Sequence, residues 1–93
     1  MNTNEREALR QKIDLVARER IPDRVLKDID VSFGEDHLGD ASVFIVLHMK
    51  SGYASREYAD AMTSLSDALM TVTDTSDGFL FPYISPRIED EAA

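Results

Sequence analysis

A ten-residue segment near the middle of the chain constrains the fold more than any other feature. Residues 41–50 read ASVFIVLHMK, and this enrichment in β-branched and apolar residues predicts a strand. Successive side chains of a strand point to opposite faces, so both faces of this one would carry apolar groups. A strand of that kind is normally covered on both sides and lies inside a sheet. Its two faces hold Val43, Ile45, Leu47 and Met49 on one side, and Ser42, Phe44, Val46 and His48 on the other.

Two amphipathic helices are predicted on either side of the central hairpin. The first runs from about Asn4 to Arg20, with Asn4 and Glu7 spaced as a capping box, and Ile21-Pro22 ends it. The second begins at the N-cap Ser55 and runs to about Val72. Each has one apolar stripe, so each needs a sheet to pack on.

The other strands follow from alternation and turn residues. Asp28–Phe33 alternates polar and apolar residues, and the turn-rich segment 34–40 joins it to the central strand as a hairpin. After a loop over 73–78, residues 79–86 form a last strand. Pro82 and Pro86 place this strand at a sheet edge, since proline cannot donate a ladder hydrogen bond.

This order, α-β-β-α-β, predicts an α+β two-layer sandwich. A helical crossover returns the chain to the starting end of the sheet, so the last strand runs parallel to the central one. The sheet is then three-stranded and mixed, with both helices on one face. Residues 1–86 form a single domain, and residues 87–93 form an acidic tail that frays.

Composition excludes several classes of function. The absence of cysteine removes disulfides, thiolate catalysis, iron–sulfur ligation and thiolate zinc sites. Net charge is −8, with seven Lys/Arg against five Asp/Glu in residues 1–27 and three against thirteen afterwards. An acidic body repels phosphate backbones, so no nucleic-acid partner is expected. With no signal sequence or membrane segment in this chain, we expect a cytoplasmic protein that does not bind membranes.

The bare face of the predicted sheet is the candidate functional surface. With only two helices available, Phe44, Val46 and His48 of the central strand lack a cover within the chain. The last strand adds Phe79, Phe81 and Tyr83, or Leu80 and Ile84 in the other register. Because contiguous exposed apolar patches usually mark interaction sites, we expect a non-enzymatic module that dimerises or binds a partner chain here. The predicted interface residues are Phe44, Val46, His48, Phe81 and Tyr83, and no catalytic residue, cofactor or metal is expected.

Two alternative functions have their own residues. The first alternative is a metal-dependent enzyme of phosphoryl or nucleotidyl transfer. Residue types that hold divalent ions in such enzymes occur in the hairpin loop at Asp36, His37 and Asp40, and on one strand face at Asp28 and Asp30. Loops also use Asp and Gly for their turns, and the spacing fits no metal pattern. The second alternative is a KH-like nucleic-acid-binding or ribosome-associated module that would use Arg6, Arg10 and Arg20 of the first helix.

Two short motifs carry a resemblance to known proteins. Residues 35–40, EDHLGD, open the central strand, and residues 81–84, FPYI, lie near the C-terminus. Together they resemble small uncharacterised bacterial proteins with an acidic-Gly-acidic hairpin and a Phe-Pro-Tyr strand, some of them in two-gene modules of the toxin–antitoxin kind. The resemblance covers about half the chain and implies no catalytic residues.

Overall fold

The structure, a computed structural model, describes residues 2–75 and 78–89 and has the predicted α-β-β-α-β order. A two-stranded pair, β3–β4, is added; it lies within the segment expected to be a loop except for Phe79, which was expected to begin the last strand. The elements are α1 (Thr3–Arg20), β1 (Leu26–Glu35), β2 (Ala41–Lys50), α2 (Ser55–Val72), β3 (Asp74–Thr75), β4 (Gly78–Phe79) and β5 (Phe81–Glu89).

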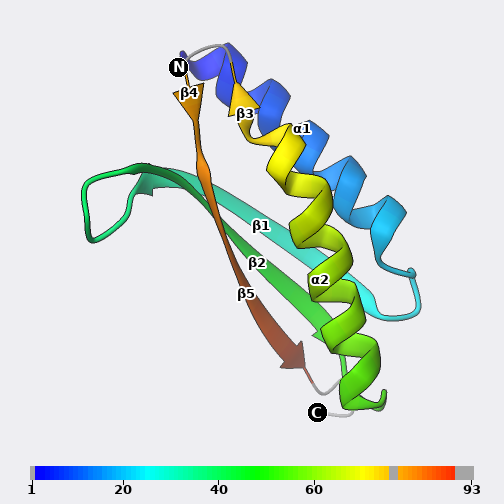
Figure 1. Ribbon diagram of the computed structural model, residues 1–93. Helices are drawn as coiled ribbons and strands as arrows, with labels where there is room; N and C mark the ends of the chain where they lie inside the picture. Colours follow the sequence, from blue (N-terminus) through cyan, green and yellow to red (C-terminus); the bar gives the residue numbers. More distant parts are fainter. Residues whose placement is uncertain (1, 76–77, 90–93) are drawn as a thin grey trace.

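The main sheet has the order β1-β2-β5, which confirms the predicted mixed sheet with β2 at its centre (Figure 1). β1 pairs with β2 antiparallel, and β5 pairs with β2 parallel. Opposite Phe44 lie Ser32 on β1 and Tyr83 on β5. Because paired residues share a face, this register puts Phe81 and Tyr83 beside Phe44, and Leu80 and Ile84 do not share their face.

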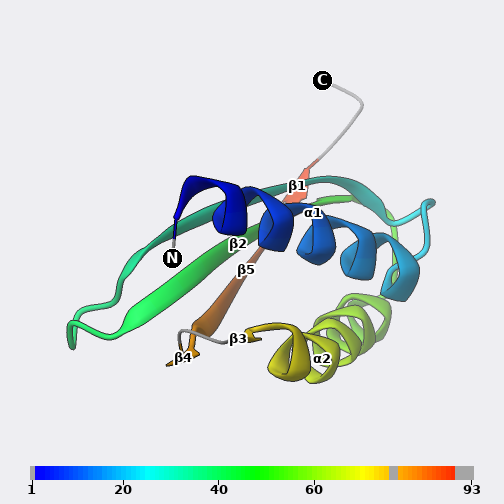
Figure 2. The ribbon, with the colours of Figure 1, turned by 90° about the horizontal axis from the view of Figure 1, so that it is seen from above.

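Both helices cover one face of this sheet, as Figures 1 and 2 show. The apolar stripes predicted for the two helices are the surfaces that meet it, since Leu9, Ile13 and Ala17 of α1 and Tyr58, Ala61, Leu65 and Leu69 of α2 are buried. The core side of β2 is fully buried. Buried strand residues that complete the core are Leu26, Ile29, Val31, Val43, Ile45, Leu47 and Met49.

The helix caps differ slightly from expectation. The N-cap of α1 is Asn2, whose side chain accepts a hydrogen bond from the Glu5 backbone N–H at 2.9 Å, so the Asn-x-x-Glu box lies two residues before the predicted one. Ala54, and not Ser55, is the N-cap of α2, and it makes no side-chain cap hydrogen bond.

The last strand begins and ends later than predicted. It starts at Phe81 and continues through Glu89, so residues 87–89 of the expected tail belong to the strand. Their backbone extends the parallel ladder, and the Glu89 carbonyl accepts a hydrogen bond from the Ser51 N–H at 3.1 Å. The rest of the predicted tail, residues 90–93, lies outside the described residues.

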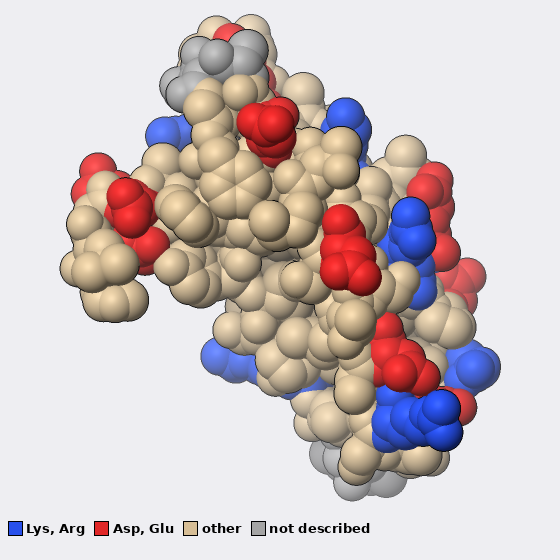
Figure 3. All heavy atoms as spheres, in the orientation of Figure 1, with Lys and Arg blue, Asp and Glu red and all other residues tan. Residues whose placement is uncertain are grey.

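Charge is distributed unevenly over the surface. Figure 3 shows basic and acidic side chains interspersed along the helices on the right, and acidic ones on the β1–β2 loop at the left. Between them, along β5, the visible surface is mostly uncharged. No helix in residues 2–75 and 78–89 is both long and apolar enough to cross a bilayer.

Candidate functional site

The face of the sheet opposite the helices, called the outer face below, carries all five predicted interface residues. Alternation along β2 puts Phe44, Val46 and His48 there, each partly exposed, while their neighbours Val43, Ile45 and Leu47 are buried. The register of β5 adds Phe81 and Tyr83. Neighbouring outer-face positions are Asp28, Asp30 and Ser32 on β1, Lys50 on β2, and Ser85, Arg87 and Glu89 on β5.

The first half of this face is an aromatic patch made of Phe44, Val46, Phe81 and Tyr83. The rings of Phe44 and Tyr83 stack, with centroids 5.6 Å apart and planes 17° from parallel. Phe81 keeps 44% of its surface exposed and Tyr83 keeps 39%, although both rings already contact a neighbour. The patch is therefore well ordered by contacts within the chain and still partly open to solvent.

Asp36 connects the β1–β2 loop to the aromatic patch through hydrogen bonds. Its Oδ1 accepts hydrogen bonds from the backbone N–H groups of Leu38 and Asp40, at 2.9 and 3.0 Å. Its Oδ2 accepts one from the Tyr83 hydroxyl at 2.7 Å. The hydroxyl, and then the backbone donors, lower the pKa of Asp36, while the carboxylate raises the pKa of Tyr83. Both oxygens of Asp36 thus have structural partners.

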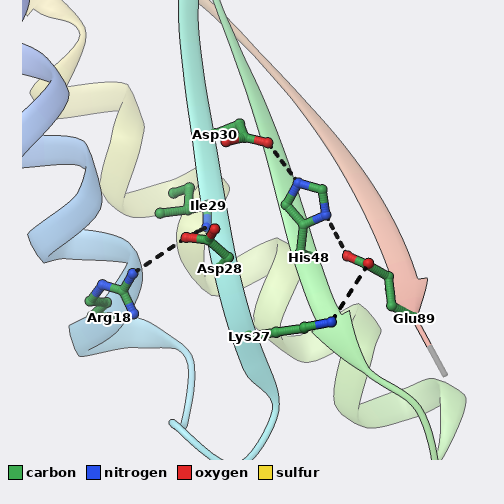
Figure 4. A network of polar contacts seen from close by, with 7 residues as sticks. All are labelled: Arg18, Lys27, Asp28, Ile29, Asp30, His48 and Glu89. Atoms are coloured by element: carbon green, nitrogen blue, oxygen red, sulfur yellow. Dashed lines mark hydrogen bonds and ion pairs between the residues drawn. The ribbon is translucent and has the colours of Figure 1, made fainter. Parts of the chain in front are cut away.

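The second half of the outer face centres on His48 (Figure 4). The ring bridges two strands, with Nε2 at 2.7 Å from Oδ2 of Asp30 on β1 and Nδ1 at 2.5 Å from Oε1 of Glu89 on β5. Lys27 approaches the same carboxylate, its Nζ 3.8 Å from Glu89 Oε2. Hydrogen bonds to Asp30 and then Glu89 raise the pKa of His48, against a smaller opposing effect of burial.

Among the described residues, neither the β1–β2 loop nor the group around His48 has the geometry of a metal centre. In the described parts of the chain, no group of three or more His, Asp or Glu side chains could hold an ion. His48, Asp30 and Glu89 are the right residue types, but the two carboxylates contact different ring nitrogens of one imidazole. An ion bound at one nitrogen would therefore have only one of the two carboxylates beside it.

The arginines considered for nucleic-acid binding do not form one surface. The guanidinium carbons of Arg6 and Arg10 lie 5.9 and 5.5 Å from the centroid of the Phe33 ring. Arg10 also donates to the backbone carbonyl of Val31 and lies 3.4 Å from a Glu7 carboxylate oxygen. Arg20 lies at the other end of α1. Arg10 thus covers the edge of β1, where its charge is already paired.

Sequence reasoning missed the partners that organise the outer face. Alternation could have put Asp30 on the face of His48 once the hairpin register was known. Glu89 could not be found in this way because residues 87–93 were predicted to fray. The tie between Asp36 and Tyr83 spans 47 residues, and no local pattern in the sequence signals it.

Comparison with known proteins adds no constraint on function. No protein-family model, curated protein or solved structure matches this chain. The resemblance to small bacterial proteins therefore stays a prediction.

Proposed function

We propose that this protein is a non-enzymatic interaction module that binds a second copy of itself through the outer face, with the aromatic patch at the centre of contact. The observation that carries the proposal is the character of β2, a central strand apolar on both faces with helices on one side only. Exposed aromatic residues beside it are the type enriched at the buried centres of protein interfaces.

The free edges of the sheet favour association through a face over association edge to edge. On β1, the Asp28 carboxylate accepts from the Ile29 N–H at 2.8 Å and Arg10 donates to the Val31 carbonyl. Two edge groups are thereby satisfied within the chain, so they are closed to a strand from another copy.

Two prolines reduce the capacity of the free edge of β5 to pair with another strand. The Glu89 carbonyl accepts a hydrogen bond from the Ser51 N–H, on the β2 side of the strand. Because backbone N–H and C=O groups of successive strand residues point to opposite sides, those of the even-numbered β5 residues point to the free edge. Pro82 and Pro86 occupy two of those positions and have no N–H to donate. Because both edges resist strand addition, the exposed apolar area of the face is the better surface for a partner.

Charge balance favours a second copy as that partner. The chain has a net charge of −8, and two acidic surfaces would repel each other. Among the described residues of the outer face, however, charges of both signs occur in equal number: Asp30, Asp36 and Glu89 against Lys27, Lys50 and Arg87. A two-fold pairing of this face with itself can therefore set opposite charges against each other around the aromatic patch.

Sedimentation equilibrium over about 1 to 200 µM protein tests the proposal, since this range covers affinities typical of modest homodimers. We expect a concentration-dependent dimer for the wild type and a monomer for Phe44→Asp, which puts a charge in the patch. Met70→Asp is the matched control, because Met70 is 52% exposed on α2, away from the outer face.

Circular dichroism of each variant separates lost association from lost folding. A wild type that stays monomeric across the range contradicts the proposal, as does a dimer that survives Phe44→Asp or dissociates with Met70→Asp. A monomer that instead forms a stoichiometric, Phe44-dependent complex with a different protein would assign the face to a heteromeric partner.

A further inference from the structure

His48 is held between two carboxylates in a way that only one of its protonation states satisfies. Both ring nitrogens lie within hydrogen-bonding distance of a carboxylate oxygen, one on Asp30 and one on Glu89 (Figure 4). A neutral imidazole has one N–H and one lone pair, whereas an imidazolium has two N–H donors. Ionised carboxylates only accept, so the full set of contacts requires the imidazolium.

We propose that His48 is a pH-operated clasp that fastens the C-terminal end of β5 to the sheet when its ring is protonated and releases it when the ring is neutral. The clasp joins the three strands, since Asp30 belongs to β1, His48 to β2 and Glu89 to β5. On loss of the proton, one carboxylate faces a nitrogen lone pair and is repelled. The released group would be Asp30 or Glu89, and in either case a link across the sheet is lost.

The end of β5 has few other side-chain contacts that could hold it. Ser85, Pro86, Arg87 and Ile88 are exposed, and Ile88 keeps 53% of its surface in solvent. α2 packs nearer the start of the strand, where Pro82 and Ile84 line a surface hollow together with Met62 and Asp67. With little apolar burial, the segment 85–89 depends on its backbone ladder and on the contacts of Glu89, so its local stability is low.

The charges around the ring do not reverse this behaviour. β1 contributes Asp28 and Asp30, β5 contributes Arg87 and Glu89, β2 itself contributes Lys50, and Lys27 reaches Glu89. The helices lie on the opposite face of the sheet. Asp28 is turned away, since its Oδ1 accepts from Ile29 N–H and lies 3.8 Å from Arg18. The two carboxylates in direct contact therefore dominate.

The direction of the pH effect follows from the folded-state pKa of His48, which these contacts raise. The stabilisation is fully present below the pKa of an unfolded-state histidine, about 6.5, and is lost as pH rises through the higher folded value. The clasp thus opens on the alkaline side of the ordinary histidine pKa.

Amide hydrogen exchange of residues 85–89 tests the clasp, with rates corrected for the intrinsic effect of pH. Between about pH 5.5 and pH 8.5, which brackets histidine titration, we expect a several-fold loss of protection in the wild type. In His48→Gln we expect low protection at both values. His37→Gln is the control, because His37 is the chain's other histidine and lies exposed on the β1–β2 loop. It should behave as the wild type does.

Nuclear magnetic resonance of the His48 imidazole gives a second readout that does not need the His48 variant to fold. We expect the pKa of His48 to lie above the ordinary histidine value of about 6.5, and Glu89→Gln to lower it. The proposal is overturned if the pKa of His48 is not raised, if Glu89→Gln leaves it unchanged, or if protection of 85–89 varies with pH equally in wild type and His48→Gln. Exchange is measured at a protein concentration at which sedimentation shows a monomer, so the protection of 85–89 does not depend on dimer formation.

Discussion

Truncating Phe81 should weaken self-association by an amount that its exposure sets. A phenylalanine presents about 200 Å² of surface, so the 44% left exposed corresponds to about 90 Å² that a partner can cover. At about 25 cal/mol/Å², covering it stabilises the dimer by about 2 kcal/mol for each copy. Both copies contribute in a two-fold dimer, so Phe81→Ser removes up to about 4 kcal/mol, a roughly thousandfold rise in the dissociation constant.

The assay is sedimentation equilibrium of Phe81→Ser beside Leu15→Ser. Leu15 is 60% exposed on α1, so its truncation removes a comparable exposed apolar area from the helical layer. Urea denaturation of both variants checks the fold, since the Phe81 ring also packs edge to face on Phe79, with centroids 5.2 Å apart. A change below about tenfold, equivalent to 1.4 kcal/mol, would refute the central position of Phe81 in the interface, as would an equal effect of Leu15→Ser.

Two further predictions concern the contacts that frame the outer face. Arg10→Ala should lower the free energy of unfolding by about 1 kcal/mol in urea denaturation, because the Val31 carbonyl loses its donor and the Phe33 ring its cover; an unchanged midpoint would contradict this. Tyr83→Phe should move the pKa of Asp36 back up toward its ordinary value in a carboxyl titration by nuclear magnetic resonance. Since the folded-state pKa of Asp36 is lowered, the wild-type tie is present above about pH 3.9 and is lost as pH falls through the lower folded value. A pKa of Asp36 identical in the two proteins would show that the hydroxyl does not hold the loop.

Local patterns predicted most of the fold because each element here follows its own periodicity. The apolar stripe of α1 at Leu9, Ile13 and Ala17 is also its buried face, and residues 41–50 form the strand that alternation and β-branching indicate. The crossover through α2 then left one direction for the last strand. The class, the strand order and the single helical layer are therefore consequences of the sequence pattern.

Boundaries and end groups depended on pairing that no local window contains. Residues 87–89 carry two charged side chains and follow Pro86, so they indicate a frayed tail. In the fold, they pair with β2, and the Ser51 N–H donates to the Glu89 carbonyl. The short β3–β4 pair is instead held by a contact close in sequence, in which the Thr75 hydroxyl donates to the Gly78 carbonyl at 2.6 Å. Such weak segments adopt the structure that their neighbours supply.

The candidate site divides along the same line. The sequence by itself determined which residues of the central strand share the outer face, because strand alternation and the apolar character of Phe44 and Val46 are encoded locally. The register of β5 then selected Phe81 and Tyr83 over Leu80 and Ile84. Only the tertiary structure decided that Asp30 and Glu89 meet on the two nitrogens of His48, because side chains distant in sequence are brought together by strand register. Register is fixed by the packing of the whole sheet, so a one-residue slip would leave each local pattern intact and separate all three groups.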